Sequence, residues 1–405
     1  MGFSMRAILA VLTLPLLSLA ACGGGGASGA ISAGTNAPPA DTGGGPVPTP
    51  TPTPGSTGGS TTAPTPTPPS QTNMFDLTAP VEFAGVGSFQ SLVERDGKDG
   101  VSTLYQANSS TVAEANGVIT YNPRDGIFTV EFDDEDAGIE KELRFQDPRH
   151  RQDADGARTD EPQIPLLAGF NYLQALDGKA RFTFFYQRPG TSGAFVSLAG
   201  FERSEFIPAD PNSQEPVDEH SAERGVLVFG AFTPVPQIPT TGTGSYDGRF
   251  LATMAGIEVG TPRTLQWIDG TSAVSVDFAK RTLAVSLQGV VGQGFSKMTA
   301  IDNAALVIPV GATFTAAGSA SWKQASGNFA GSFSAASFKS ADGRTIPVDF
   351  TPLGAGAETG VAGASSIDGA FYGPDARNVG ANFRIVSGVP NRRLDILGAF
   401  VGQRK

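Results

Sequence analysis

Residues 272–287 read SAVSVDFAKRTLAVSL, and this stretch decides the fold class. Apolar side chains alternate with small or polar ones on both sides of the turn Ala279–Arg281: Val274, Val276 and Phe278 precede it, and Leu283, Val285 and Leu287 follow it. Strict alternation is typical of a strand with one buried face. Two such runs around a short polar turn predict an antiparallel hairpin.

The same period of two continues to the end of the chain. It occurs in Ser245–Met254 and in three further sets: Phe314, Ala316, Gly318, Ala320 and Trp322; Phe329, Gly331, Phe333 and Ala335; Leu394, Ile396, Gly398 and Phe400. Asp342-Gly343 is typical of a tight turn. Residues 241–405 are therefore predicted to hold about eight short strands. Because glycine and alanine at inward positions let a sheet coil and close, we expect a small eight-stranded antiparallel β-barrel. Its outward Ser, Thr and charged residues predict a soluble barrel without a lipid-facing band.

Residues 74–240 are also predicted to be β-rich, so the fold class is all-β. Gly126–Phe132 alternates, and Ala180–Tyr186 and Ala194–Ala199 have the composition of central strands. We expect polar loops at Gln146–Pro162 and Ile207–Glu223. The boundary to the barrel is marked by Pro234, Pro236 and Pro239.

The N-terminus has the features of an export signal. Residues 1–22 read MGFSMRAILAVLTLPLLSLAAC, with Arg6 before an apolar run that is too short for a permanent transmembrane helix. The run ends in Leu19-Ala20-Ala21-Cys22, which resembles a bacterial lipobox and contains the single cysteine of the chain. We therefore expect a signal peptide at residues 1–21 and a lipidated Cys22. The alternative is an ordinary secretory signal with an incidental cysteine.

Residues 22–73 are predicted to be a disordered tether between the lipid and the folded part. They carry few large apolar side chains and contain Thr-Pro repeats at Thr49–Pro54 and Thr62–Pro69, which favour extended polyproline II spacers. Gly23 stands where an aspartate often marks retention in the inner membrane, so we expect an anchor in the outer membrane. The formal net charge of −11 excludes nucleic acid as an expected partner.

We find no constellation of residues for catalysis or metal binding. The two histidines, His150 and His220, lie in predicted polar loops, no Gly-x-Ser-x-Gly elbow occurs, and no histidine pair has metal-ligand spacing. The acidic cluster Asp133–Asp136 lacks the spacing of a calcium loop and is predicted to be a solvated hairpin tip. Haem ligation by either histidine, or by Tyr172 or Tyr186, stays open. We therefore expect neither an enzyme nor a resident cofactor, with haem as the exception to test.

Two segments of the second half resemble a known family. GVLVFGAFTPVPQIPTTGTGSYDG (225–248) and SIDGAFYGPDARNVGANFRI (366–385) are similar to the junction and the signature of transferrin-binding protein B lobes, and the ending GAFVGQRK is similar to their closing strand. The matching signature residues, which we interpret as structural, are Gly369, Phe371, Tyr372, Gly373, Pro374, Gly380 and Phe383. Asn378 stands where the family has an acidic residue, and Ala381 replaces its second glycine.

The resemblance covers about residues 238–405 and implies a β-rich handle-like subdomain, residues 74–240, followed by a barrel, residues 241–405. The family's transferrin receptors have two such lobes, whereas this chain has room for one. By resemblance, the protein is an outer-membrane lipoprotein, facing the cell surface rather than the periplasm. It would capture a host or environmental protein, or a haem or iron-bearing ligand, and deliver it to an outer-membrane transporter. A haem carrier and a structural or adhesive surface protein without an iron role are the alternatives.

Overall fold

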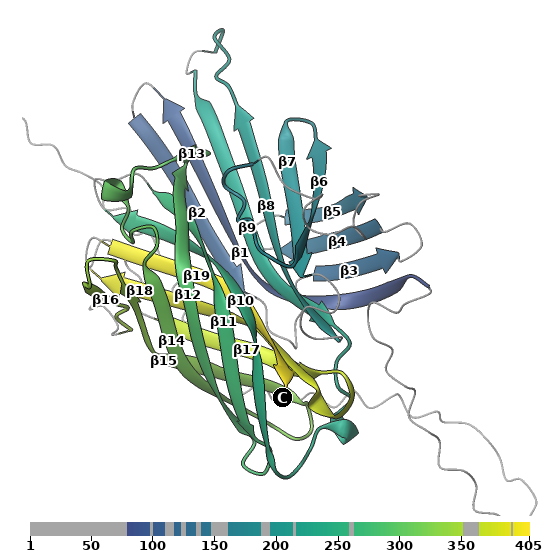
Figure 1. Cartoon of the computed structure of the whole chain (residues 1–405). Coiled ribbons are helices and arrows are strands. Elements are labelled where there is room, and N and C mark those ends of the chain that lie inside the picture. The colour runs from purple at the N-terminus through teal and green to yellow at the C-terminus, as the bar shows by residue number, and fades with distance from the viewer. Residues whose placement is uncertain are drawn as a thin grey trace, which may run out of the picture. The chain divides into compact units, whose positions relative to one another are not determined.

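Two antiparallel sheets make up the part of the chain that the computed structural model describes (Figure 1). The described residues are 79–97, 100–109, 117–122, 127–134, 139–146, 161–187, 195–213, 216–258, 263–350, 364–389 and 392–405. The predicted signal peptide, Cys22, the tether and His150 lie outside them. Among the described residues, no helix is long and apolar enough to cross a membrane. The all-β prediction is confirmed.

The N-terminal sheet has nine strands in the order β5-β4-β3-β1-β9-β8-β7-β6, with β2 also on β1. The first residues of β1 pair with β3, its later residues pair with β2, and β9 covers its other edge. The strands are β1 (Val81–Gly97), β2 (Gly100–Ser109), β3 (Gly117–Asn122), β4 (Ile127–Asp134), β5 (Ile139–Gln146), β6 (Phe170–Asp177), β7 (Ala180–Gln187), β8 (Val196–Ile207) and β9 (Asp218–Gly230).

An aromatic cluster fills the inside of this sheet. Phe128 of β4 lies 4.6 Å from the ring of Tyr186 in β7, and Phe145 of β5 lies 5.5 Å from Phe184 of β7. These strands are far apart in the order of the sheet, so the sheet curls around its own core. Alternation in β4 is as expected, since Phe128 and Val130 are buried and Glu131 is exposed.

The second sheet closes into an eight-stranded barrel. Its strands follow one another in the order β11-β10-β19-β18-β17-β15-β14-β12, and pairing of β11 with β12 completes the ring. The strands are β10 (Thr243–Glu258), β11 (Thr264–Asp277), β12 (Thr282–Ser296), β14 (Thr313–Trp322), β15 (Asn328–Lys339), β17 (Ala364–Tyr372), β18 (Asn378–Val389) and β19 (Arg392–Arg404). Two short strands, β13 (Thr299–Ala300) and β16 (Thr345–Pro347), extend its wall. The barrel prediction is confirmed.

Aromatic side chains pack the inside of the barrel. Phe250 lies 6.0 Å from Phe314 and 6.2 Å from Phe383, measured between ring centroids. The inward residues of the predicted hairpin are all buried, as the alternation requires. Glycine permits the close approach of strands at particular points: a Cβ at Gly248 would lie 1.9 Å from the carbonyl oxygen of Val401.

Three expectations from the sequence were wrong in detail. The barrel strands are not short, since the eight wall strands run from 9 to 16 residues. Ala335 is exposed and Ala336 is buried, because a bulge at Ser334 shifts the register between β14 and β15. The predicted loop Ile207–Glu223 holds the end of β8 and the first residues of β9, which begins at Asp218. The other predicted loop lies largely outside the described residues.

The signature segment forms the end of β17, a tight turn and the start of β18. Phe371 and Phe383 point into the barrel, while Tyr372 is buried under the N-terminal sheet. Gly373 has a φ of 72°, and a Cβ there would lie 2.5 Å from the ring of Phe195, so only glycine fits. The turn η4 (Pro374–Ala376) follows.

Candidate functional site

The N-terminal sheet packs directly on the outer wall of the barrel. Apolar residues from both sheets form one buried cluster there, which includes Val226, Leu251, Trp267 and Tyr372. Hydrogen bonds cross the contact, among them one from Ser88 Oγ to the carbonyl oxygen of Phe383 at 3.2 Å and one from Asn382 Nδ2 to that of Gly87 at 3.1 Å. The two sheets therefore belong to one compact unit.

A buried ion pair lies within this contact. Glu202 of β8 and Arg224 of β9 are 2 % and 1 % exposed, and Arg224 Nε lies 2.7 Å from Glu202 Oε2. The Arg224 guanidinium also lies 5.0 Å from the ring centroid of Trp267, whose Nε1 donates to the carbonyl oxygen of Gln163 at 3.0 Å. Burial raises the pKa of Glu202 to about 7, although the charge of Arg224 opposes this shift. Burial likewise lowers the pKa of Arg224.

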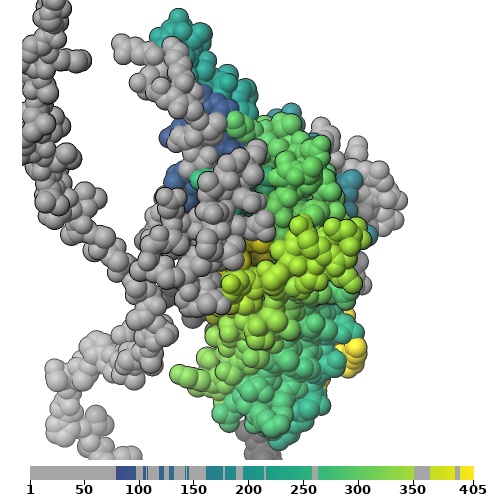
Figure 2. All heavy atoms as spheres, turned by 90° about the vertical axis from the view of Figure 1, so that its left-hand side faces the viewer, coloured from purple at the N-terminus to yellow at the C-terminus, as the bar shows by residue number. Residues whose placement is uncertain are grey.

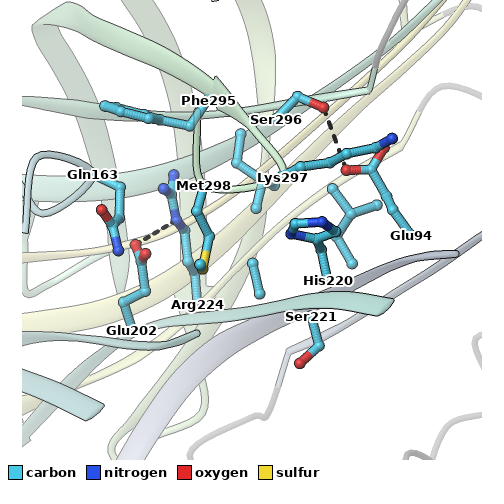
Figure 3. A pocket seen from close by; sticks show the side chains of 13 residues that line it. Glu94, Gln163, Glu202, His220, Ser221, Arg224, Phe295, Ser296, Lys297 and Met298 are labelled. Atoms are coloured by element: carbon cyan, nitrogen blue, oxygen red, sulfur yellow. Dashed lines mark hydrogen bonds and ion pairs between the residues drawn. The ribbon is translucent and has the colours of Figure 1, made fainter. Parts of the chain in front are cut away.

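A narrow pocket opens beside the ion pair, between β9 and the turn after β12 (Figure 3). Glu202 and Arg224 stand at one end of it, and Glu94, His220 and Lys297 stand at the other (Figure 3). Glu94 is 3 % exposed, accepts a 3.3 Å hydrogen bond from Ser296 Oγ, and has a pKa raised by its burial. Among the described residues, Nδ1 of His220 has no hydrogen-bond partner.

No group of three or more His, Cys, Asp or Glu side chains in the described part of the chain could hold a metal ion. The ring of His220 packs at a tilt against the ring of Phe206, with centroids 4.5 Å apart. Charged and aromatic contacts, such as that of Arg224 with Trp267, join the N-terminal sheet to the barrel here.

Beyond the pocket, turns from both sheets meet at one end of the molecule. Lys297 of the barrel forms an ion pair with Asp96 of β1, and Arg95 Nε lies 2.7 Å from Glu219 Oε2 of β9. Three apolar side chains are exposed here: Phe206 by 39 %, Ile207 by 41 % and Met298 by 36 %. We name Asp96, Phe206, Lys297 and Met298 the tip surface; Ile207, which follows Phe206 in β8, faces the other side of the sheet. The β8–β9 hairpin, in teal, projects at this end beyond the green barrel (Figures 1 and 2).

The predicted haem-ligand tyrosines are both buried and have hydrogen-bond partners. The hydroxyl of Tyr172 donates to the carbonyl oxygen of Pro165 at 2.7 Å and accepts from the Leu167 N–H at 2.6 Å. The hydroxyl of Tyr186 accepts from Asn171 Nδ2 at 3.0 Å. Burial raises the pKa of Tyr172 to about 12. Both phenols are therefore held by hydrogen bonds in this arrangement, and neither lies on the tip surface.

Sequence reasoning missed the ion pair and the tip surface. The single useful signal is the placement of Glu202 and Arg224 next to apolar strand segments, where a charged residue requires a buried partner. His220, which we expected in a polar loop, lies in β9 and lines the pocket.

Comparisons with known proteins give matches in a protein family and among solved structures. Residues 238–404 match the family described as the C-lobe and N-lobe β-barrels of Tf-binding protein B. No curated protein matches the chain.

The solved structures share low identity with this chain. One is a variant of transferrin-binding protein B from Haemophilus parasuis Hp5, with 13% identity, 83% of this chain and 78% of that chain covered, and a TM-score of 0.34. Another is isotype 1 transferrin-binding protein B from serogroup B Neisseria meningitidis, with 11% identity, 81% and 77% covered, and a TM-score of 0.24. A surface lipoprotein has 14% identity, with 78% and 98% covered and a TM-score of 0.30.

The family match spans the complete barrel, from the first residue of β10 to the last residue of β19. The barrel of this chain is therefore similar, over residues 238–404, to the β-barrels of transferrin-binding protein B lobes.

Proposed function

We propose that this chain is a lipid-anchored outer-membrane protein that captures an iron-carrying protein through its tip surface and passes it to an outer-membrane transporter. The observation that carries the proposal is the tip surface itself, where exposed apolar residues from both sheets meet. The family match supports an iron role, because the proteins of that family are named for transferrin binding.

The composition of the tip surface suits a protein partner. Aromatic residues and methionine are enriched at the centres of protein interfaces, and Phe206 and Met298 supply both types. Charged groups at the rim of an interface guide association, and Asp96 and Lys297 stand beside the apolar residues.

The tip surface is also held in place before any partner binds. An ion pair between Asp96 and Lys297 ties β1 to the turn after β12, and an ion pair between Arg95 and Glu219 ties β1 to β9 beside it. The buried contact between the two sheets lies directly below it. A preorganised surface loses less conformational entropy on binding, which favours affinity.

The inside of the barrel offers less support for a small ligand. Its described interior is packed with aromatic side chains, among them Phe250, Phe314, Phe371 and Phe383. In the N-terminal sheet, Tyr172 and Tyr186 already have hydrogen-bond partners. A haem carrier therefore needs a different ligand set from these tyrosines, and the protein ligand is the better supported reading.

Surface plasmon resonance with immobilised iron-loaded transferrin tests the proposal. The analyte is the chain from residue 23 onward, which contains every described residue. Interface residues at the centre of a contact often contribute more than about 2 kcal/mol each, so Phe206→Ala with Met298→Ala should weaken binding by on the order of 100-fold or more. The matched control is Val290→Ala, which removes a side chain 51 % exposed on the barrel wall and should leave binding unchanged.

The outcomes separate the alternatives. Unaltered binding by the tip variants would place the site elsewhere. Failure of transferrin and other iron-carrier proteins to bind, together with a shifted Soret band on adding haem, would favour the haem carrier. Failure in both assays, together with an expression level of the protein that does not change when the cells are starved of iron, would favour the structural or adhesive role. Radiolabelled palmitate incorporated by the native chain and not by Cys22→Ser would establish the anchor.

A further inference from the structure

Basic side chains gather at the end of the barrel opposite the tip surface. The strands β11, β14, β17 and β19 end there, and β10, β12, β15 and β18 begin there, so the turns between them form one rim. The C-terminal residues mark this end in Figure 1. Six basic residues lie on these turns and on the last residues of β19, and we name them the basic rim: Lys280, Arg281, Lys323, Arg377, Arg404 and Lys405.

The basic rim has an excess of positive charge in an acidic protein. Three acidic residues lie on or beside its turns, namely Asp247, Asp277 and Asp375, so that its side chains have an excess of three positive charges, against −11 for the side chains of the whole chain. Lys280 Nζ lies 2.9 Å from Asp277 Oδ2, and Lys405 Nζ lies 2.6 Å from Asp247 Oδ2.

Four members of the rim have no such partner, and one of them, Arg404, donates to the carbonyl oxygens of Asp375 and Thr243. Arg281, Lys323 and Arg377 are exposed, and none of them forms an ion pair with an acidic side chain in the part of the chain that the structure describes. Each belongs to a different turn, after β11, after β14 and before β18. Three unpaired cations on separate turns of one rim make a broad positive surface and not a pocket for a single small anion.

The early part of β1 lies toward this same end. Gly85 near the start of β1 pairs with Phe229 near the end of β9. The chain then runs from β9 to the rim, where the Gly373 N–H donates to the carbonyl oxygen of Ala231 at 2.9 Å and the Thr233 N–H donates to that of Phe371 at 2.8 Å. Gly85 of β1 therefore lies toward the end of β9 that leads to the basic rim, and not toward the end beside the tip surface.

We propose that the basic rim docks on the anionic lipid headgroups of the membrane in which the chain is anchored. The recognised feature is the net negative charge of the anionic headgroups, which attracts exposed Lys and Arg side chains at short range. The negative charge elsewhere on the protein does not prevent this, because at physiological ionic strength charges separated by more than about 8 Å are largely screened. The proposal rests on the anchor of the proposed function, which holds the rim near the headgroups at high effective concentration.

Docking by the rim also fixes which way the protein faces. Since the tip surface and the rim lie at opposite ends, a docked rim directs the tip surface away from the membrane. The ligand-binding end is then presented outward even though the predicted tether is long.

Vesicle sedimentation with the chain from residue 23 onward tests the rim without the anchor. This chain lacks Cys22 and so carries no acyl group, and the failure of the anchor cannot be confused with the failure of the rim. We expect binding to phosphatidylcholine vesicles that contain phosphatidylglycerol, no binding to pure phosphatidylcholine, and weaker binding as NaCl is raised.

Neutralising variants locate the binding surface. Arg281→Gln, Lys323→Gln and Arg377→Gln together should lower the partition coefficient by on the order of 100-fold, since each basic residue near an anionic surface contributes about fivefold. The matched control, Lys179→Gln with Lys339→Gln and Arg344→Gln, removes the same charge from exposed positions outside the rim and should change it little. Circular dichroism confirms that both variants fold. Equal loss in the two variants, equal binding to neutral vesicles, or no binding of the parent chain to the anionic vesicles would each overturn the proposal.

Discussion

Removing Arg224 should destabilise the contact between the two sheets more than any surface substitution. Arg224→Met deletes the charge 2.7 Å from Glu202 and leaves a carboxylate that is 2 % exposed without its partner. Breaking a buried ion pair in this way typically costs about 3–5 kcal/mol. Replacing both partners with apolar residues, as in Glu202→Leu with Arg224→Met, should be close to neutral or stabilising, because no charge is then left buried.

The penalty should depend on pH in a particular direction. At pH 8 the unpaired Glu202 must either stay ionised inside the contact or be protonated at a proton concentration so low that protonation itself costs free energy. Near pH 5.5 protonation is easier, because burial already raises the pKa of Glu202 to about 7 in the intact pair. The cost of Arg224→Met should therefore be smaller at the lower pH.

Urea unfolding followed by tryptophan fluorescence measures these effects. The chain has two tryptophans, so a Trp322→Phe background leaves Trp267, whose ring lies 5.0 Å from the Arg224 guanidinium, as the reporter of the contact. The control is Arg95→Met, which breaks an exposed ion pair with Glu219 and should cost less than about 1 kcal/mol. If Arg224→Met at pH 8 costs no more than this control, the ion pair does not stabilise the contact and the reasoning is wrong.

Three further predictions concern single groups. The pKa of Glu202 is about 7 in the fold against an ordinary value of 4.5, so its contribution to stability is present below pH 4.5 and is lost as pH rises through 7, by on the order of 3 kcal/mol. The urea midpoint of the native chain should therefore fall relative to that of Glu202→Gln between pH 5 and pH 8. A difference between the two midpoints that stays constant with pH contradicts this prediction. Gly248→Ala places a Cβ 1.9 Å from the carbonyl oxygen of Val401 and should lower the melting temperature by several degrees, through overpacking of about 1–3 kcal/mol; an unchanged melting curve refutes it. The buried hydroxyl of Tyr372 has no hydrogen-bond partner among the described residues, so Tyr372→Phe should leave the melting temperature unchanged or raise it, and a clear loss would show that the hydroxyl has a partner.

The barrel could be predicted from the sequence because its pattern is local. Val274, Val276 and Phe278 alternate with polar residues, and each alternate position on a strand faces the same side of the sheet. The structure buries all three inside the barrel. The turn at Asp342-Gly343 was predictable for the same reason, since Gly343 with a φ of 84° supplies the backbone conformation of a tight turn.

The bulge in β15 and the first residues of β9 could not be predicted from local patterns. One extra residue at Ser334 moves the side chain of Ala335 outward. The alternation of apolar and polar residues before Ser334 does not predict this shift. Glu219 and Glu223 made the start of β9 resemble a loop. In the fold they are compatible with a strand because Arg95 and Arg203 lie across from them on β1 and β8.

The candidate binding surface was beyond sequence reasoning because it is assembled from distant segments. Asp96 and Lys297 are about two hundred residues apart in the chain, and their ion pair exists only because β1 and the turn after β12 meet when the sheet packs on the barrel. The same holds for Arg224 and Trp267.

One strand connects the two proposed surfaces and sets the distance between them. β9 runs for 13 residues from Asp218, beside the tip surface, to Gly230, which leads to the basic rim. At about 3.3 Å per residue this strand is roughly 40 Å long, which is several times the screening length in physiological salt. A rim docked on headgroups would therefore hold the tip surface beyond the electrostatic reach of the membrane, and the stiffness of the paired strands would provide that separation. The tether would then set how far the protein can move from its anchor, and the fold would set which end meets the ligand.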